Sequence, residues 1–224
     1  FKKAKFFGNI KFCSPLNDQK DSYDSTTINL NDKKKIWCAI STHEGEEIFC
    51  GKVHNLIKRT HKDTMTIIIP RHIERTQKIF SDLEKMGLKV QIKNENENIN
   101  NSADIVLVNY YGSVLGYIKK IKQVFIGKSI LKKLKKDGGQ NPIDAAKMGC
   151  NIFHGPFVSN FREIYEYLDN QKISQEINEA DELAKKLTEN FSAKKETEIE
   201  KRSRLIEYSD SIFKNVIKEY ESFI

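Results

Sequence analysis

Short apolar runs alternate with stretches of helical periodicity along most of this chain, and this alternation limits the possible folds more than any other feature. Each run is bounded by turn residues and has the length of a buried strand. Strands that alternate with helices imply a largely parallel sheet covered on both faces. We therefore predict an α/β fold with a Rossmann-like, doubly wound parallel sheet and C-terminal helices. The predicted strands are residues 36–40, 65–69, 88–92, 104–108, 123–126 and 151–154.

The same pattern predicts three parts in the chain. Residues 1–35, with the polar stretch Asn17–Thr27, have little periodicity and are interpreted as a lead-in segment or linker from a preceding domain. Residues 36–170 form the sheet domain, and residues 171–224 are predicted to be helices that pack on it or return to the preceding domain. The predicted helices of the sheet domain lie near 45–60, 73–86, 113–121 and 141–148.

The charge of the chain is local. The 224 residues carry a formal net charge of +7, but Lys119–Lys136 alone holds eight lysines and no acid. Without these eight, 30 basic side chains face 31 acidic ones. Only six of the basic residues are arginines, whereas specific nucleic-acid readers favour arginine forks, so no nucleic-acid partner is expected. A solvated lysine loop and a basic module for nucleic acid or anionic membranes both stay open as alternatives.

Several classes of protein are not supported by the sequence. The residues from Phe1 onward contain no apolar run of about 18 residues, no charged leader and no lipidation motif, so we expect a soluble fragment. The four cysteines are scattered without C-x-x-C spacing, which favours a reducing, cytoplasmic setting. The histidines show no H-x-x-x-H pair, and no metal or cofactor is predicted.

In an open parallel sheet, ligands bind at the carboxyl ends of the strands, so the loops after the strands are the candidate sites. After the first strand, Ser41 or Thr42 is expected to cap the next helix. After the second, Arg71 follows a proline and is placed to hold an anionic oxygen with its fork of donors. A surface salt bridge between Arg71 and Glu74 is the alternative.

Two later loops carry glycines. Gly112, after the strand at 104–108, lets the backbone approach a planar ligand, and the adjacent Tyr111 could stack on a base, although ordinary turn chemistry fits as well. The segment Asp137–Ala146 places two glycines before a predicted helix start, an arrangement that binds phosphate, although a simple glycine turn stays possible. It is neither a Walker loop nor G-x-G-x-x-G. Asn160 follows a Gly-Pro turn as an expected helix cap.

Five motifs occur in a fixed order between residues 6 and 170. They are GNIKF at 8–12, STHEGEE at 41–47, PRHIER at 70–75, GGQNPIDAA at 138–146 and GPFVSNFREI at 155–164. Together they resemble the family of lipid A 3-deoxy-D-manno-octulosonic acid (Kdo) transferases, which use the GT-B glycosyltransferase fold. The resemblance implies a C-terminal donor-binding domain of such an enzyme.

In that family two Rossmann-like domains face each other, and the C-terminal one holds the donor CMP-Kdo. The resemblance implies transfer of Kdo, with inversion and without a bound metal, to the lipid A precursor at the cytoplasmic face of the bacterial inner membrane. The family's catalytic base is a glutamate that precedes the G-N-x-K-F segment. We therefore expect no catalytic residue in this chain, which by itself should bind the donor without turning it over.

The resemblance also assigns donor contacts. Arg71 would contact the phosphate, Asp144 the ribose and the Tyr111 loop the cytosine. The predicted donor-binding set is Ser41, Arg71, Tyr111, Gly112, Ser113, Gly138, Gly139, Gln140, Asn141, Asp144 and Asn160. Three members depart from the family pattern, because Ser113 replaces an acid, Gln140 a histidine and Asp144 a glutamate. The lysines of Lys119–Lys136 would add attraction for the donor or for anionic lipid. A related GT-B enzyme that uses another nucleotide sugar remains an alternative.

Overall fold

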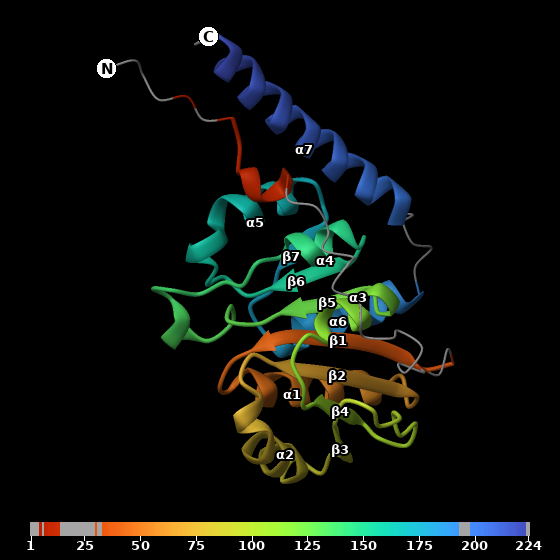
Figure 1. Ribbon diagram of the computed structural model, residues 1–224. Helices are drawn as coiled ribbons and strands as arrows, with labels where there is room; N and C mark the ends of the chain where they lie inside the picture. The colour runs from red at the N-terminus through yellow and green to blue at the C-terminus, as the bar shows by residue number, and fades with distance from the viewer. Residues whose placement is uncertain (1–4, 6, 14–29, 31–32, 193–197, 223–224) are drawn as a thin grey trace.

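The computed structural model describes residues 5, 7–13, 30, 33–192 and 198–222, which fold around one sheet (Figure 1). All six strand pairs in that sheet are parallel. The predicted doubly wound α/β fold is therefore confirmed. The strands are β1 (Lys35–Thr42), β2 (Thr64–Pro70), β3 (Val90–Lys93), β4 (Ile105–Val108), β5 (Gln123–Ile126), β6 (Asn151–His154) and β7 (Ser174–Glu176), in the spatial order β3-β4-β2-β1-β5-β6-β7.

The strand order reverses next to β1. The chain leaves β1 for β2, runs to β3 at the outer edge, returns to β4 between β3 and β2, and then places β5 on the other side of β1. The helix that follows β1 packs on one face of the sheet, and the helix that follows β5 packs on the other. Open α/β sheets bind ligands at the carboxyl ends of the strands near such a switch point.

Side chains alternate between two cores, one on each face of the sheet. In β1, Trp37 and Ala39 pack on one face, while Cys38 and Ile40 pack on the other. The first face is covered by α1 (Glu46–Lys58), α2 (Thr76–Glu84) and α6 (Ala180–Ser192). The second is covered by α3 (Val114–Lys120), α4 (Ile143–Lys147), α5 (Arg162–Asn170) and α7 (Glu198–Glu221).

The C-terminal part departs from the helical pattern predicted for it. Strand β7 separates α5 from α6 and pairs with β6, with Ile152 opposite Ser174. Its three residues, Ser-Gln-Glu, are too few for a period-two signal, and only Ser174 is buried. The strand exists because β6 offers an edge to pair with, which is tertiary information.

The described stretch 7–13 of the lead-in segment packs against α7, beside which it lies in Figure 1. It forms the 3-10 helix η1 (Ile10–Cys13), whose Phe12 is buried against the rings of Tyr167 and Tyr208 at centroid distances of 5.3 and 5.2 Å. Gly8 has φ +116°, and a Cβ there would lie 2.7 Å from Ile212. Residues of the motif at 8–12 therefore pack closely against side chains of α7. The polar stretch Asn17–Thr27 lies outside the described residues.

Among the helices of the described part of the chain, none is long and apolar enough to cross a bilayer. The longest, α7, has 24 residues and carries charges throughout.

Candidate functional site

The carboxyl ends of the strands bring four predicted loops to one edge of the sheet. Ser41 lies at the end of β1, Arg71 directly follows β2, Gly112 follows β4 and Gly139 follows β5. Neighbouring loops are also bonded to each other, since the Arg71 N–H donates to the carbonyl of Thr42 at 3.0 Å. The strand-end prediction thus places these residues correctly along one edge.

Arg71 is exposed and forms no side-chain ion pair with any residue that the structure describes. The alternative salt bridge to Glu74 is wrong, because Glu74 accepts a hydrogen bond from the hydroxyl of Tyr111 at 2.8 Å. A hydrogen bond from its own backbone lowers the pKa of the Glu74 carboxyl most, and the hydrogen bond from Tyr111 lowers that pKa further. The guanidinium is therefore available to an anionic ligand.

In the loop after β4, Tyr111 is exposed and Ser113 is buried. Gly112 has φ +81°, a left-handed conformation that suits glycine. Tyr111 is 55% exposed, so its ring is accessible. Ser113 is buried, and its hydroxyl lies 3.4 Å from the carbonyl of Tyr110 within the same turn. Of the three predicted contacts, Tyr111 and Gly112 are therefore exposed to a ligand, whereas Ser113 is buried.

The glycine loop is packed tightly on the loop that follows β6. A Cβ on Gly138 would lie 2.1 Å from the carbonyl oxygen of Phe157, and Gly139 has φ +95°. The N–H of Gly139 donates to the carbonyl of Lys128 at 2.5 Å. The side-chain amide of Asn160 donates to the carbonyl of Asp137 at 2.8 Å. The predicted capping role of Asn160 is wrong, since its side chain ties the two loops together and caps no helix.

Helix α4 is short, with only five residues, and its dipole is correspondingly weak. The side chain of Asn141, which precedes the N-cap Pro142, accepts the N–H of Ile143 at 3.0 Å and fixes the turn that leads into the helix. The backbone N–H groups of Gln140 and Asn141 themselves donate to no acceptor in the described structure. Asp144 lies in the first turn of the helix, and it is exposed. The loop therefore offers free amides and one carboxylate to a ligand.

Two buried carboxylates of the STHEGEE motif hold this edge together. The predicted cap by Ser41 or Thr42 is wrong, because α1 begins after Gly45 without a side-chain cap. Glu46 instead accepts four backbone N–H groups, at 2.6 Å from Lys128, 2.8 Å from Ser129, 2.9 Å from His43 and 3.2 Å from Ile130. Burial raises the pKa of the Glu46 carboxyl, and these N–H groups oppose the rise.

The second carboxylate, Glu47, is bound by both ends of the Arg75 guanidinium at 3.1 and 2.9 Å. Thr42 donates to it as well, at 3.0 Å. This buried pair fixes the 3-10 helix η4 (Ile73–Arg75), which follows the Arg71 turn, against the end of β1. The sequence predicts both glutamates in the first turn of a helix, but it does not predict their hydrogen-bond partners.

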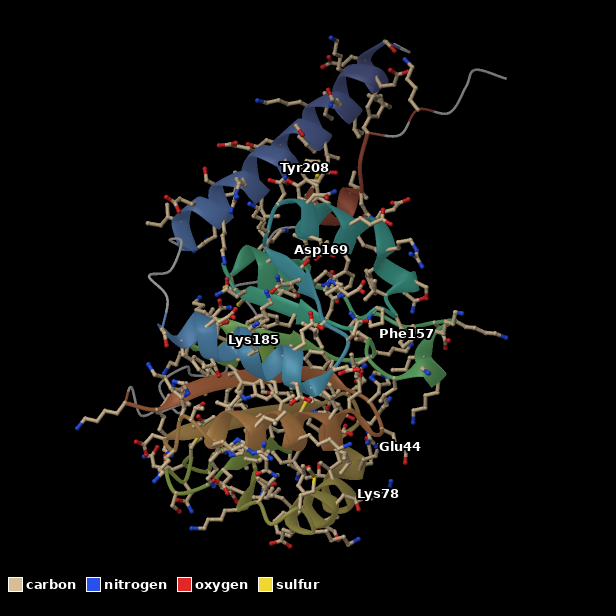
Figure 2. All side chains as sticks on the ribbon, turned by 180° about the vertical axis from the view of Figure 1, so that it is seen from behind. Glu44, Lys78, Phe157, Asp169, Lys185 and Tyr208 are labelled. Atoms are coloured by element: carbon tan, nitrogen blue, oxygen red, sulfur yellow. The ribbon has the colours of Figure 1, made fainter. Side chains whose placement is uncertain are left out.

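The eight lysines of Lys119–Lys136 do not form one surface. Lys119, Lys120 and Lys122 precede β5, while the others follow it, so a strand of about 10 Å separates the two groups. Four of the second group lie exposed on the projecting segment around η5 (Lys132–Leu134). Lys133 lies 3.9 Å from Glu44, which also pairs with Lys78 at 2.8 Å (Figure 2). Only this second group borders the candidate site.

No family model matches the chain. It is 28% identical over 166 residues to the 3-deoxy-D-manno-octulosonic acid transferase of Aquifex aeolicus, which covers 74% of this chain and 44% of the relative. It is 26% identical over 224 residues to the enzyme of the same name from Rickettsia prowazekii, covering 99% of this chain and 47% of the relative. The chain thus spans about half the length of the curated relatives it matches.

Solved structures share the fold. The C-terminal CMP-Kdo binding domain of WaaA from Acinetobacter baumannii is similar with a TM-score of 0.67 and 16% identity, over 92% of this chain and 99% of that one. An O-GlcNAc transferase from Thermobaculum terrenum is similar with a TM-score of 0.51 and 11% identity, over 89% of this chain and 35% of that one.

The sheet order and these neighbours show the Rossmann-like fold that is found in the C-terminal domains of GT-B glycosyltransferases. Within that class, the chain is a homologue of the Kdo transferases.

Proposed function

We propose that this chain binds the CMP-Kdo donor of an enzyme that transfers Kdo to the lipid A precursor. One observation carries the proposal. The unpaired guanidinium of Arg71, after β2, and the free N–H groups of Gln140 and Asn141, after β5, lie along the same edge of the sheet. A cation and free amides are the groups that bind a phosphate, and the relatives named for Kdo transfer supply the choice of donor.

The roles of the residues follow from their places. Arg71 and the loop formed by Gly138–Asn141 hold the phosphate and the acidic sugar. The carboxylate of Asp144 accepts hydrogen bonds from the ribose hydroxyls. The cytosine lies against the Tyr111–Ser113 loop, where the tyrosine ring is exposed. Ser41 and Asn160 line the same edge, Asn160 through its hold on the glycine loop.

The proposed reaction makes the phosphate the leaving group. An acceptor hydroxyl oxygen bonds to the anomeric carbon and gives its proton to the base that the resemblance assigns to the preceding domain. The bond between that carbon and the phosphate oxygen breaks at the same time, its electron pair stays on the oxygen, and CMP departs. Arg71 and the free amides stabilise the added negative charge, which lowers the barrier because they are already in place. This chemistry gives these residues a larger role in the transition state than in holding the intact donor.

We further propose that the exposed lysines near η5 attract anions to this edge, either the donor or the anionic lipids of the inner membrane surface. Their position beside the site supports this, whereas the lysines before β5 lie at the opposite edge. In this proposal the enzyme works at the cytoplasmic face of the bacterial inner membrane, where its lipid acceptor is exposed.

Thermal protection by CMP tests the proposed donor site. We expect CMP at millimolar concentration to raise the melting temperature, and Arg71→Ala to remove most of that increase. Arg59→Ala is the matched control, since Arg59 is also exposed but follows α1 at the opposite edge of the sheet. No protection of the unmodified chain by CMP, or equal loss in both variants, contradicts the proposal.

A further inference from the structure

The carboxylate of Glu46 occupies a concave group of backbone N–H donors that is built to bind an anion. Lys128, Ser129 and Ile130 are consecutive residues that begin two positions after the end of β5, and all three N–H groups point at this one carboxylate. Lys128 takes a left-handed φ of 58°, which turns consecutive N–H groups to the same side. The protein therefore fills its own anion site, at the switch point of the sheet, with a side chain from α1.

The residues that Glu46 holds are the ones that anchor the glycine loop. The N–H of Lys128 donates to Glu46, and its carbonyl accepts the N–H of Gly139. Ser129 continues the connection to the β6 loop, since its hydroxyl accepts the N–H of Gly155 at 2.9 Å and its carbonyl accepts that of Phe157. A single carboxylate thus fixes the β5 loop, and the β5 loop fixes both neighbours.

Close packing restricts the conformation of the loop that follows β5. A Cβ on Gly127 would lie 2.6 Å from the carbonyl oxygen of Ser41 and 2.8 Å from the Glu46 carboxylate. The β5 loop therefore passes against the end of β1 in close contact, and its N–H groups are turned away from the solvent. Any ligand phosphate must bind elsewhere on the edge.

We propose that Glu46 is a positioning residue for donor binding, an internal anion that sets the glycine loop through Lys128 without touching the donor. This inference rests on the proposed function for its ligand, but the link from Glu46 to Gly139 is a property of the chain itself. A donor that binds through the free amides of Gln140 and Asn141 depends on where Gly139 is held.

Glu46→Gln tests this without changing the size of the side chain. The amide keeps one oxygen as an acceptor but turns an NH₂ group toward two of the four N–H donors, so that donors face donors. We expect hydrogen exchange at Gly139 and Lys128–Ile130 to become at least tenfold faster. We also expect the dissociation constant for CMP to rise at least tenfold, at a temperature where the variant is fully folded.

Asp104→Asn is the matched control. Asp104 is also a buried carboxylate that accepts a backbone N–H, from Lys89 at 3.0 Å, but it lies at the opposite edge of the sheet. The Asp104→Asn variant should have a lower melting temperature, while hydrogen exchange at Gly139 and the affinity for CMP stay unchanged. A purely structural role for Glu46 predicts the same behaviour in both variants.

A second variant covers the case in which Glu46→Gln does not fold. Glu46→Ala empties the anion site, so added sodium formate should stabilise it more than the unmodified chain and restore protection at Gly139, with sodium chloride at equal ionic strength as the control. Unchanged Gly139 exchange in Glu46→Gln, or no rescue by formate of a destabilised Glu46→Ala, overturns the inference. Failure of the unmodified chain to bind CMP refutes the proposed function instead, and the exchange data still decide the role of Glu46.

Discussion

Replacing Gly138 by alanine separates the shape of the glycine loop from the stability of the fold. The added Cβ would lie 2.1 Å from the carbonyl oxygen of Phe157 and 2.7 Å from that of Leu134, and both atoms belong to the backbone. Non-bonded heavy atoms need about 3.5 Å, so one loop must move by about 1.4 Å. Overpacking of this kind costs about 1–3 kcal/mol of folding free energy. A displacement of this size breaks a hydrogen bond from the loop to the phosphate, and the loss of such a bond to a charged group lowers affinity by roughly 10- to 100-fold.

Gly87→Ala provides the comparison. Gly87 has φ +77° but has nothing within 4 Å of the added Cβ, and it lies between α2 and β3, away from the site. Alanine in this left-handed conformation costs about 1–2 kcal/mol. Both variants should therefore lose similar stability in urea denaturation, while isothermal titration shows weakened CMP binding only in Gly138→Ala. Equal CMP affinity in the two variants would refute the tight loop contact and its role in binding.

Three further changes test the packing and the electrostatics. Burial lowers the pKa of His54 from 6.5 to about 4, so the unfolded chain takes up a proton between these values that the fold excludes. Stability should then fall as the pH drops through that window, by up to about 3 kcal/mol in urea denaturation, and His54→Gln should flatten the slope. Arg75→Ala leaves a buried carboxylate without its cation and should lower the free energy of unfolding by about 3 kcal/mol, whereas Lys78→Ala removes only an exposed pair and should change it little. Phe12→Ala should detach the lead-in segment and speed hydrogen exchange in α7, while Phe213→Ala, which is 54% exposed on the same helix, should not.

The strands of the sheet could be predicted because their signal is local. Runs such as Ile105–Val108 are buried on both faces and read as continuous apolar segments in the sequence itself. Strand β7 could not be predicted, since only the exposed edge of β6 makes Ser174–Glu176 a strand. The order of the strands also has no local signal, but the alternation with helices was enough to indicate a parallel sheet.

The candidate site was partly visible in the sequence for the same reason. Arg71 and Gly139 could be placed at one edge because the carboxyl ends of parallel strands share it. The role of Glu46 was hidden, because its partner Ser129 lies 83 residues away in the chain. The eight lysines looked like one basic surface because they are close in the sequence. Strand β5 lies between the two groups and carries the chain from one edge of the sheet to the other.

Base selectivity tests the central claim most directly. Isothermal titration of the chain with CMP, UMP and AMP compares three ligands that carry the same phosphate and ribose but different bases. A CMP-Kdo donor site predicts binding of CMP at least tenfold tighter than that of UMP or AMP, with the difference carried by the loop that holds Tyr111 and Gly112. Equal affinity for all three nucleotides, tighter binding of UMP or AMP, or no heat of binding with CMP at millimolar concentration contradicts the claim.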